Sequence, residues 1–285
     1  MLRPVTTLPD FLIIGAQKGG TTSLADYLNA HRDVVPSQYK EVHFFDNDYG
    51  KGVDWYRSHF QVQVRHRIRK MLLGIRFVAG DATPYYLLHP LAASKCHSLL
   101  PEARIIVMLR DPVDRAYSHY HHQVRHGHEF LSFEEALEAE SSRLEGQLER
   151  FAADPLYRSF DHQHFSYLAR GVYLPQIESW RTFYSPQQIL VLSSEQFFAQ
   201  PSVEYHRVLK FLGLQAQELR EYPAQHVGSY QPMSAATRIR LIEYFAPHNH
   251  SLREYLNSTW PGVGDCVVSK WHHPKTLEQD KLARV

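Results

Sequence analysis

Cysteines, excess charge and long apolar runs are all scarce in this chain. Only two of its 285 residues are cysteines, Cys96 and Cys266, which are too few for a disulfide framework and are typical of a reducing compartment. The 31 basic and 30 acidic residues leave a formal net charge of +1, so no overall field attracts nucleic acid or a membrane. No apolar run reaches the roughly 20 residues that span a bilayer, and the first residues do not resemble a secretory signal. These absences favour a cytoplasmic protein in which any anion would bind at a local site.

Short apolar runs that alternate with longer helical patterns are what the chain does contain. Four runs predict buried strands, over residues 11–14, 77–80, 104–109 and 188–192. Helical patterns cover residues 21–30, 90–100, 112–126, 201–212 and 234–245, and a further one starts at Ser132. Pro247 is expected to end the last of these helices. The alternation predicts an α/β fold with a parallel sheet flanked by helices on both faces, in one domain over residues 1–285 with a loosely attached tail after about residue 271.

The turn after the first predicted strand, G-A-Q-K-G-G-T-T-S (Gly15 to Ser23), combines glycine, lysine and hydroxyl side chains. In an open parallel sheet such a turn presents backbone N–H groups at a helix N-terminus, where anions bind. Lys18 adds a positive charge, and Gly19 and Gly20 allow the backbone to approach a phosphate closely. Three hydroxyl side chains that could cap the helix or donate to the anion follow: Thr21, Thr22 and Ser23. The alternative is an ordinary tight turn with Lys18 in solvent.

The order of residues in this turn differs from that of a Walker A loop. A Walker A loop reads G-x-x-x-x-G-K-[ST], with the lysine after the last glycine. Here Lys18 precedes both glycines. The order G-x-x-K-G-G-T-T-S instead resembles the 5′-phosphosulfate loop of the sulfotransferases that use 3′-phosphoadenosine 5′-phosphosulfate (PAPS). The resemblance implies a P-loop-like sulfotransferase fold in which this turn binds PAPS and, after transfer, the product PAP.

A second motif, R-D-P-V-D-R-A-Y-S (Arg110 to Ser118), follows the third predicted strand. It begins with an arginine before Asp111, which can cap the next helix. It resembles the 3′-phosphate motif of the same family, and the resemblance implies that Arg110 and Ser118 bind the 3′-phosphate. A planar guanidinium and a hydroxyl both suit phosphate oxygens. The alternatives are an ion pair of Arg110 with Asp111 or Asp114, and an exposed position for Ser118.

The third motif, K-E-V-H-F-F-D, covers Lys40 to Asp46. It resembles the K-E-x-H-F-F-D segment of the heparan-sulfate type of carbohydrate sulfotransferase, in which the glutamate is the proposed general base. The resemblance implies that Glu41 acts as the base, with Lys18 and His43 as the other catalytic residues, and that the acceptor is a saccharide.

The chemistry of this third motif is consistent with proton transfer. If the segment is extended, alternation places Glu41 and His43 on one face. Burial against Phe44 and Phe45 would raise the pKa of Glu41 toward the range useful for a general base. The alternative is a solvated Glu41 beside Lys40.

The resemblance extends over about residues 10–261 of the chain. A later segment, H-V-G-S-Y at residues 226–230, resembles a family segment near the cofactor and adds Ser229 and Tyr230 to the implied cofactor-binding residues. The chain also departs from the pattern. Where glycan-acting members often have Glu-Lys-Thr-Pro, it has Asp-Ala-Thr-Pro, with Ala82 in the place of the lysine.

Five histidines close together in the sequence suggest a metal site. They are His119, His121, His122, His126 and His128. His122 and His126 are four residues apart and would share one face of a helix. Because there is neither an H-E-x-x-H pattern nor a nearby cysteine pair, we expect a solvated helix face and no metal ion.

The sequence thus predicts a sulfotransferase that moves the sulfuryl group from PAPS to a hydroxyl or amine of an acceptor, on a saccharide. A small metabolite, or a hydroxyacyl chain on an acyl carrier protein, is the alternative acceptor. A P-loop kinase that uses ATP and magnesium is a more remote alternative, disfavoured by the position of Lys18 and by the Arg110 motif. A module that binds the nucleotide without turnover is another, although binding alone needs no base such as Glu41.

Overall fold

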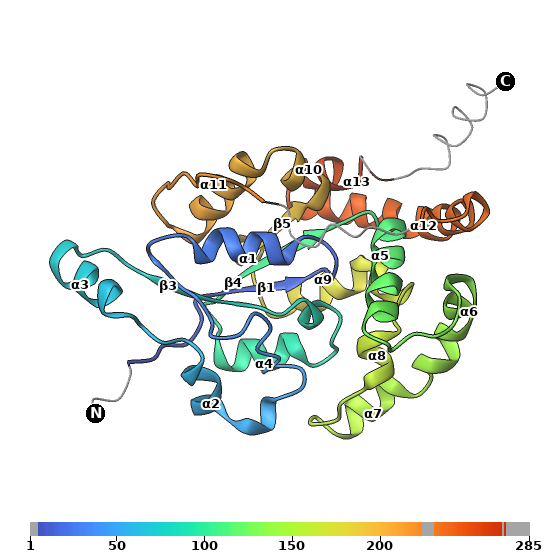
Figure 1. Cartoon of the computed structure of the whole chain (residues 1–285), viewed down its shortest axis with the longest axis horizontal. Helices are drawn as coiled ribbons and strands as arrows, with labels where there is room; N and C mark the ends of the chain where they lie inside the picture. The colour runs from blue at the N-terminus through green and yellow to red at the C-terminus, as the bar shows by residue number, and fades with distance from the viewer. Residues whose placement is uncertain (1–4, 224–230, 270, 272–285) are drawn as a thin grey trace.

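One parallel sheet forms the centre of the fold. The structure is a computed structural model that describes residues 5–223, 231–269 and 271 (Figure 1). Most of the tail that was expected to be loosely attached, residues 272–285, lies outside the described residues. The sheet has the order β2-β3-β1-β4-β5, and every neighbouring pair is parallel. The strands are β1 (Phe11–Gly15), β2 (Val34–Val35), β3 (Val78–Ala82), β4 (Arg104–Leu109) and β5 (Ile189–Ser193).

Helices connect the strands and continue the chain beyond β5. The first group is α1 (Thr21–Asn29), α2 (Val53–Ser58), α3 (Val64–Leu73), α4 (Ala92–Leu99), α5 (Pro112–Arg125), α6 (Phe133–Leu144) and α7 (Gln147–Ala153). The second is α8 (Phe160–His164), α9 (Tyr173–Arg181), α10 (Ser194–Ala199), α11 (Pro201–Leu212), α12 (Ala235–Thr259) and α13 (Val263–Val268). Short 3-10 helices are η1 (Tyr49–Lys51), η2 (Pro84–Leu87), η3 (Ala169–Gly171) and η4 (Pro186–Gln188).

Each face of the sheet has its own apolar core, because alternate side chains of a strand point to opposite faces. On one face Leu12 belongs to a buried cluster that includes Trp180 of α9. On the other face Ile13 belongs to a cluster that includes Leu24 of α1 and Val208 of α11. Figure 1 shows α1, α10 and α11 on one side of the sheet and α4 on the other. The predicted α/β fold with helices on both faces is confirmed.

Two expectations about helix ends are wrong. Gly20, with a φ of 95°, occupies the N-cap of α1, so no threonine side chain caps this helix and Thr21 is its first residue. Glycine adopts this left-handed conformation without steric cost. Pro247 does not end α12, which continues to Thr259. Phe245 and Leu252, on either side of the proline, are both buried, and this packing compensates the roughly 3 kcal/mol that an interior proline costs.

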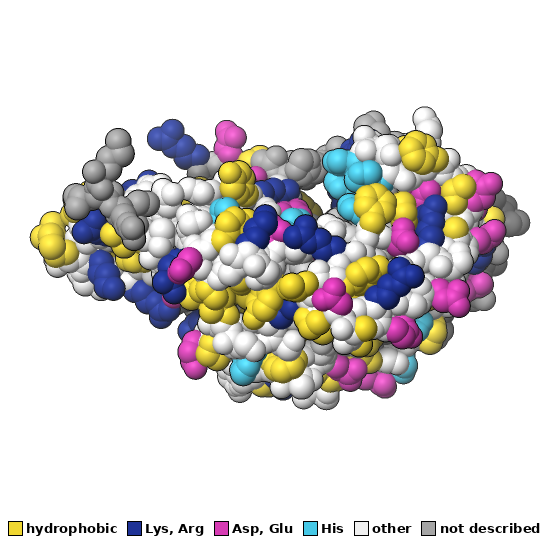
Figure 2. All heavy atoms as spheres, turned by 90° about the horizontal axis from the view of Figure 1, so that it is seen from below, with side chains coloured by type: hydrophobic (Ala, Val, Ile, Leu, Met, Phe, Trp, Pro, Cys, Tyr) yellow, Lys and Arg dark blue, Asp and Glu magenta, His cyan; other side chains and the backbone are white. Residues whose placement is uncertain are grey.

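Helix α3 lies beyond the β2 edge of the sheet, at the opposite end of the molecule from α6 and α12 (Figure 1). An ion pair attaches it to the body, with Nε of Arg69 2.7 Å from Oδ1 of Asp33, the residue before β2. Figure 2, a view from below, shows hydrophobic and basic side chains together on the surface at this end. No helix was expected here from the sequence.

Helix α5 begins with the cap that the sequence predicted. Oδ1 of the buried Asp111 accepts hydrogen bonds from the backbone N–H groups of Val113 (2.8 Å) and Asp114 (3.4 Å). This cap fixes the start of the helix that carries Ser118.

We predict that Asp111→Ala lowers the free energy of unfolding by about 1–2 kcal/mol, because the first-turn N–H groups lose their acceptor. Asp111→Asn should retain most of the stability, since asparagine caps about as well as aspartate. Urea denaturation of the three proteins measures both effects. An asparagine variant as unstable as the alanine variant would show that the negative charge at the helix N-terminus matters more than the cap.

Candidate active site

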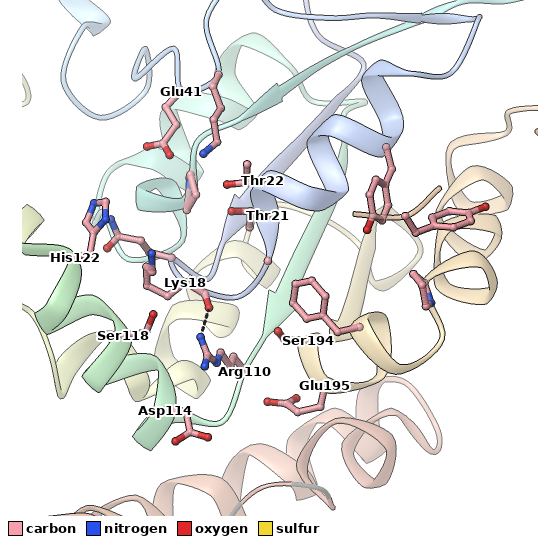
Figure 3. A pocket seen from close by; sticks show the side chains of 18 of the residues that line it. Lys18, Thr21, Thr22, Glu41, Arg110, Asp114, Ser118, His122, Ser194 and Glu195 are labelled. Atoms are coloured by element: carbon pink, nitrogen blue, oxygen red, sulfur yellow. Dashed lines mark hydrogen bonds between the residues drawn. The ribbon is translucent and has the colours of Figure 1, made fainter. Parts of the chain in front are cut away.

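A cavity of about 920 Å³ opens where β1, β4 and β5 end (Figure 3). The turn after β1 contributes Lys18 to its wall, and the residue after β4 contributes Arg110. The start of α10, directly after β5, contributes Ser194 and Glu195. This is the carboxyl edge of the parallel sheet, where ligands of open α/β folds bind.

The structure brings most of the sequence-predicted site residues together around this cavity. Seven of them line it: Lys18, Gly20, Thr21, Thr22, Glu41, Arg110 and Ser118. Three more are neighbours of lining residues without being part of the wall: Gly19, Ser23 and His43. The last two predicted residues, Ser229 and Tyr230, lie outside the described residues.

Gly19 is required by the fold of the turn. A Cβ at this position would lie 2.7 Å from the carbonyl oxygen of Met108 in β4 and 2.9 Å from that of Ala16. The turn is also attached to β4 by a hydrogen bond of 2.7 Å from the Ala16 N–H to the Met108 carbonyl. Close approach to the neighbouring strand is therefore a second reason for glycine here, beside the predicted close approach to a phosphate.

Arg110 contacts the glycine turn directly. Its Nη1 donates a hydrogen bond of 3.0 Å to the carbonyl oxygen of Lys18, drawn as the dashed line in Figure 3. The two carboxylates considered as its ion-pair partners have other roles. Asp111 caps α5, and Oδ1 of Asp114 lies 2.9 Å from Nη1 of Arg238.

Positive charge is concentrated in the wall of the cavity. Burial, and then the nearby charges of Arg125, Arg110 and Lys40, lower the pKa of Lys18 to about 8. All four cations line the same cavity. Lys18 and Arg110 are partly shielded from water, and cations that repel one another favour the binding of an anion, because a bound anion relieves the repulsion.

Glu41 and His43 lie together, as the third motif predicted, but not on an extended strand. His43 has a positive φ of 54°, and the segment turns at this residue. Nε2 of His43 is 3.3 Å from a carboxylate oxygen of Glu41, and Nδ1 is 2.7 Å from Oδ2 of the buried Asp46. Burial alone would lower the pKa of His43, but the hydrogen bonds to Asp46 and Glu41 raise it to about 10. At neutral pH His43 is a cation between two carboxylates.

The expected raised pKa of Glu41 is wrong. Burial alone would raise this pKa, but the hydrogen bond and the charge of His43, together with Lys40, lower it overall. Phe44 does not cover the carboxylate but stacks on Tyr56 in the core, with ring centroids 4.3 Å apart. Glu41 is therefore ionised at neutral pH.

A buried carboxylate at the end of β3 forms the centre of a hydrogen-bond network. Oδ2 of Asp81 accepts from the hydroxyls of Tyr56 and Tyr86, both at 2.9 Å, and Oδ1 accepts from Thr83 at 2.8 Å. Burial raises the pKa of Asp81 to about 6, and the three hydrogen bonds oppose this rise. Asp81 and Thr83 belong to the Asp-Ala-Thr-Pro stretch in which Ala82 replaces a lysine.

The same network holds the backbone of the third motif. Oγ1 of Thr83 accepts from the N–H of Val42 (3.2 Å), and the hydroxyl oxygen of Tyr86 accepts from the N–H of Phe44 (2.9 Å). These amides belong to irregular backbone and would otherwise be buried without a partner from a strand or helix. The position of the loop that carries Glu41 therefore depends on side chains anchored to Asp81.

Several residues of the wall were not predicted from the sequence. They include Asp114, His122, Arg125, Ser194, Glu195, Phe198 and Tyr222. A signal existed for two of them, because His122 and Arg125 follow Ser118 by four and seven positions and so share its face of α5. Phe198 and Tyr222 belong to no recognised motif, and only the fold brings them to the cavity.

The histidines of α5 do not form the expected solvated face. His119 is fully buried, and His122 lines the cavity. Burial, followed by the charge of Lys18, lowers the pKa of His122 to about 4, so this ring is neutral. Among the described residues, no group of three or more His, Cys, Asp or Glu side chains is arranged to hold a metal ion.

Comparisons with known proteins show the family to which this fold belongs. Residues 8–282 match the family model described as a sulfotransferase domain. The chain is 30% identical over 282 residues to human bifunctional heparan sulfate N-deacetylase/N-sulfotransferase 3, a match that covers 88% of this chain and 30% of that protein. It is 26% identical over 315 residues to membrane-associated sulfotransferase kil1 of Dictyostelium discoideum, covering 88% and 65% of the two chains. The crystal structure of a sulfotransferase from Alicyclobacillus acidocaldarius has a TM-score of 0.65 and 29% identity, covering 88% and 96%.

The chain belongs to the sulfotransferase family and is an enzyme of that class. The kinase and non-catalytic alternatives are thereby set aside. The expectation of a cytoplasmic location is overturned, because the Dictyostelium relative is membrane-associated. Within the described ranges, no helix combines the length and the apolar character needed to cross a membrane.

We predict that the imidazole of His43 titrates near pH 10, above the ordinary value of 6.5, because two carboxylates hold its proton. The contribution of protonated His43 to the free energy of unfolding is therefore complete below about pH 6.5 and is lost as the pH rises through about 10. Histidine NMR signals measured against pH check the pKa. Urea denaturation of His43→Gln beside the native chain, at neutral and at alkaline pH, checks the contribution.

His250→Gln is the control for this titration, since His250 forms an exposed pair with Glu254 at 3.4 Å. It should change stability little at either pH. A His43 signal that titrates near pH 6.5 would contradict the doubly paired geometry.

We predict that Tyr86→Phe disturbs the loop of Glu41 and that Tyr56→Phe does not. Each variant removes one hydroxyl that donates to Asp81, at a cost of about 1–3 kcal/mol of stability. Only Tyr86 also accepts from the backbone of the loop, at the N–H of Phe44. Tyr86→Phe should therefore shift the NMR signals of His43 and lower kcat severalfold, whereas Tyr56→Phe should leave both near their native values. Equal effects of the two variants would contradict the link to the loop.

Proposed function

We propose that this enzyme transfers the sulfuryl group of PAPS to a hydroxyl or amine of a saccharide. The observation that carries the proposal is the arrangement of two groups of anion-binding residues in one cavity. Lys18 and the start of α1 form one group, and Arg110 with Ser118 forms the other. A ligand with anions at two separate positions matches this arrangement better than a ligand with a single phosphate chain.

The chemistry of the lining residues supports a place for each part of the donor. The 5′-phosphosulfate would bind Lys18, the N–H group of Gly20 and the hydroxyls of Thr21 and Thr22. The 3′-phosphate would bind Arg110 and Ser118. Gly19 and Ser23, which belong to the same turn, remain assigned to the cofactor by the sequence resemblance. Ser229 and Tyr230 remain assigned to the cofactor by the sequence resemblance. The ring of Phe198, which is 41% exposed, offers a flat surface for the adenine.

The proposed mechanism is an in-line transfer. The ionised carboxylate of Glu41 accepts the proton of the acceptor hydroxyl or amine as that oxygen or nitrogen forms a bond to sulfur. The bond between sulfur and the bridging oxygen of the phosphate breaks, and its electron pair stays on that oxygen. Lys18 and the backbone N–H groups at the start of α1 stabilise the negative charge that develops there. His43 positions Glu41 rather than acting as a second base, because it already carries its proton.

The nature of the acceptor is supported by the third motif and by the relatives. The human relative is named a heparan sulfate N-sulfotransferase, and about 30% identity extends over the part of that protein that this chain covers. A saccharide acceptor is therefore proposed first. A small metabolite, or a hydroxyacyl chain on an acyl carrier protein, remains the alternative.

We predict that PAP binds without metal and more tightly than ADP or magnesium-ATP, measured by isothermal titration calorimetry. Arg110→Ala should weaken PAP binding at least about tenfold, because a charge-assisted phosphate contact is lost, and should affect ADP much less. Arg125→Ala is the matched control, since it removes another cation of the same wall that is not assigned to the 3′-phosphate, and it should weaken the binding of PAP and ADP to a similar extent. Preference for magnesium-ATP, or indifference of PAP binding to Arg110→Ala, would refute the assignment of the donor.

A variant of Glu41 separates the binding of the donor product from sulfuryl transfer. Glu41→Gln should bind PAP as the native chain does and should lose sulfuryl transfer from PAPS. Amino sugar and neutral oligosaccharides, a small alcohol and a hydroxyacyl carrier protein are then compared as acceptors. If the sulfuryl group is transferred only to the hydroxyacyl carrier protein and to no saccharide, the proposed saccharide acceptor is wrong and the carrier-protein alternative replaces it.

A further inference from the structure

Helix α3 presents an apolar stripe to solvent. Val64, Ile68, Met71 and Leu72 recur at the spacing of one helix face, and each is between 45% and 76% exposed. The usual orientation of an amphipathic helix, with its apolar face toward the core, is reversed here. A contiguous apolar surface of this kind marks an interaction site.

Polar contacts fix this orientation. On the opposite face of α3 the buried residue is His66, and Arg69 forms its ion pair of 2.7 Å with the buried carboxylate of Asp33. Lys70 lies over the ring of Phe77, 5.7 Å from its centroid. Rolling the apolar stripe inward would break the Arg69–Asp33 pair and leave the buried carboxylate with only the longer contact of 3.8 Å to Arg32, so the stripe stays outside.

The stripe lies in a strongly basic segment. Residues 61–80 contain five Lys or Arg residues and no Asp or Glu, in a chain whose net charge is only +1. Arg65 and Arg67 are exposed, and helical geometry places them on either side of the apolar stripe. Figure 2 shows basic side chains beside hydrophobic ones at this end of the molecule.

We propose that α3 is a docking helix for the surface of an anionic lipid bilayer. A helix with apolar side chains on one face and arginines beside them lies in the interface of a membrane, where apolar groups enter the acyl region and cations meet the lipid headgroups. Charge complementarity favours this occupant over a second copy of the chain. A second copy would present the same segment, which contains no Asp or Glu and so offers no acidic partner to Arg65 and Arg67.

The proposed docking surface is separate from the cavity. It lies at the β2 edge of the sheet, whereas the cavity opens at the ends of β1, β4 and β5. The bilayer contact therefore concerns where the enzyme works and does not depend on the proposed donor or acceptor.

Vesicle flotation tests the proposal with the full chain. Vesicles of phosphatidylcholine alone are compared with vesicles that also contain phosphatidylserine, at low and high salt. We expect binding to the anionic vesicles that weakens with salt, and little binding to the neutral ones. Met71→Ser with Leu72→Ser should reduce the partition coefficient at least about tenfold, and Arg65→Gln with Arg67→Gln should do the same.

Leu148→Ser with Val203→Ser is the matched control, since each of these side chains is 58% exposed, on α7 and α11. It should leave vesicle binding unchanged, and thermal unfolding should show that all variants keep the native Tm. Absence of binding to anionic vesicles, or equal losses in the control variant, would overturn the proposal. The proposal would also be overturned if the chain forms a dimer in solution, if Met71→Ser with Leu72→Ser dissociates this dimer, and if vesicle binding is absent.

Discussion

The buried carboxylate of Asp81 is the interaction on which the candidate active site depends. It stands in β3, next to the central strand β1, and has no contact with solvent. A buried carboxylate is stable only when hydrogen bonds replace its water, and three hydroxyls do so here. Two of these hydroxyl oxygens in turn accept from backbone N–H groups of the Glu41 loop. Hydrogen bonds that start from a strand of the sheet thus hold in place a segment that has no regular secondary structure.

The electrostatics of the cavity divide into two regions. Around Lys18 and Arg110, four cations outnumber the three acidic side chains of the wall, which favours an anion. Around Glu41, charges of opposite sign alternate, since His43 lies between two carboxylates. The first region suits a charged donor, and the second keeps a carboxylate ionised and fixed in direction beside it. The residues proposed for proton transfer and for anion binding are therefore neighbours that influence one another, since Lys40 lowers the pKa of both Lys18 and Glu41.

The sheet and the main anion-binding residues were predictable because they depend on local patterns. Apolar runs located four of the five strands to within a residue or two, and the glycine turn and Arg110 follow strand ends directly, but the two-residue strand β2 was not predicted. The lowered pKa of Glu41 was not predictable, because it depends on a turn at His43 that no alternation rule contains. Neither was the continuation of α12 through Pro247, where tertiary packing outweighs a local preference. Helix α3 was missed although Val64, Ile68 and Leu72 recur at helical spacing, and its outward orientation depends on the Arg69–Asp33 ion pair.

The hydrogen bond from Arg110 to the Lys18 carbonyl couples the two ends of the proposed donor site. A ligand that moves the guanidinium of Arg110 also changes the backbone at Lys18, which forms the other end of the proposed site. The binding free energies of two ligand fragments will therefore not add up to that of the whole molecule. The site therefore senses the separation of two anions as well as their number. When the second phosphate of a nucleotide lies elsewhere, the guanidinium of Arg110 keeps its hydrogen bond to the Lys18 carbonyl and does not contact that phosphate. In the proposed donor site, selectivity therefore depends on this internal hydrogen bond as well as on contacts with the ligand.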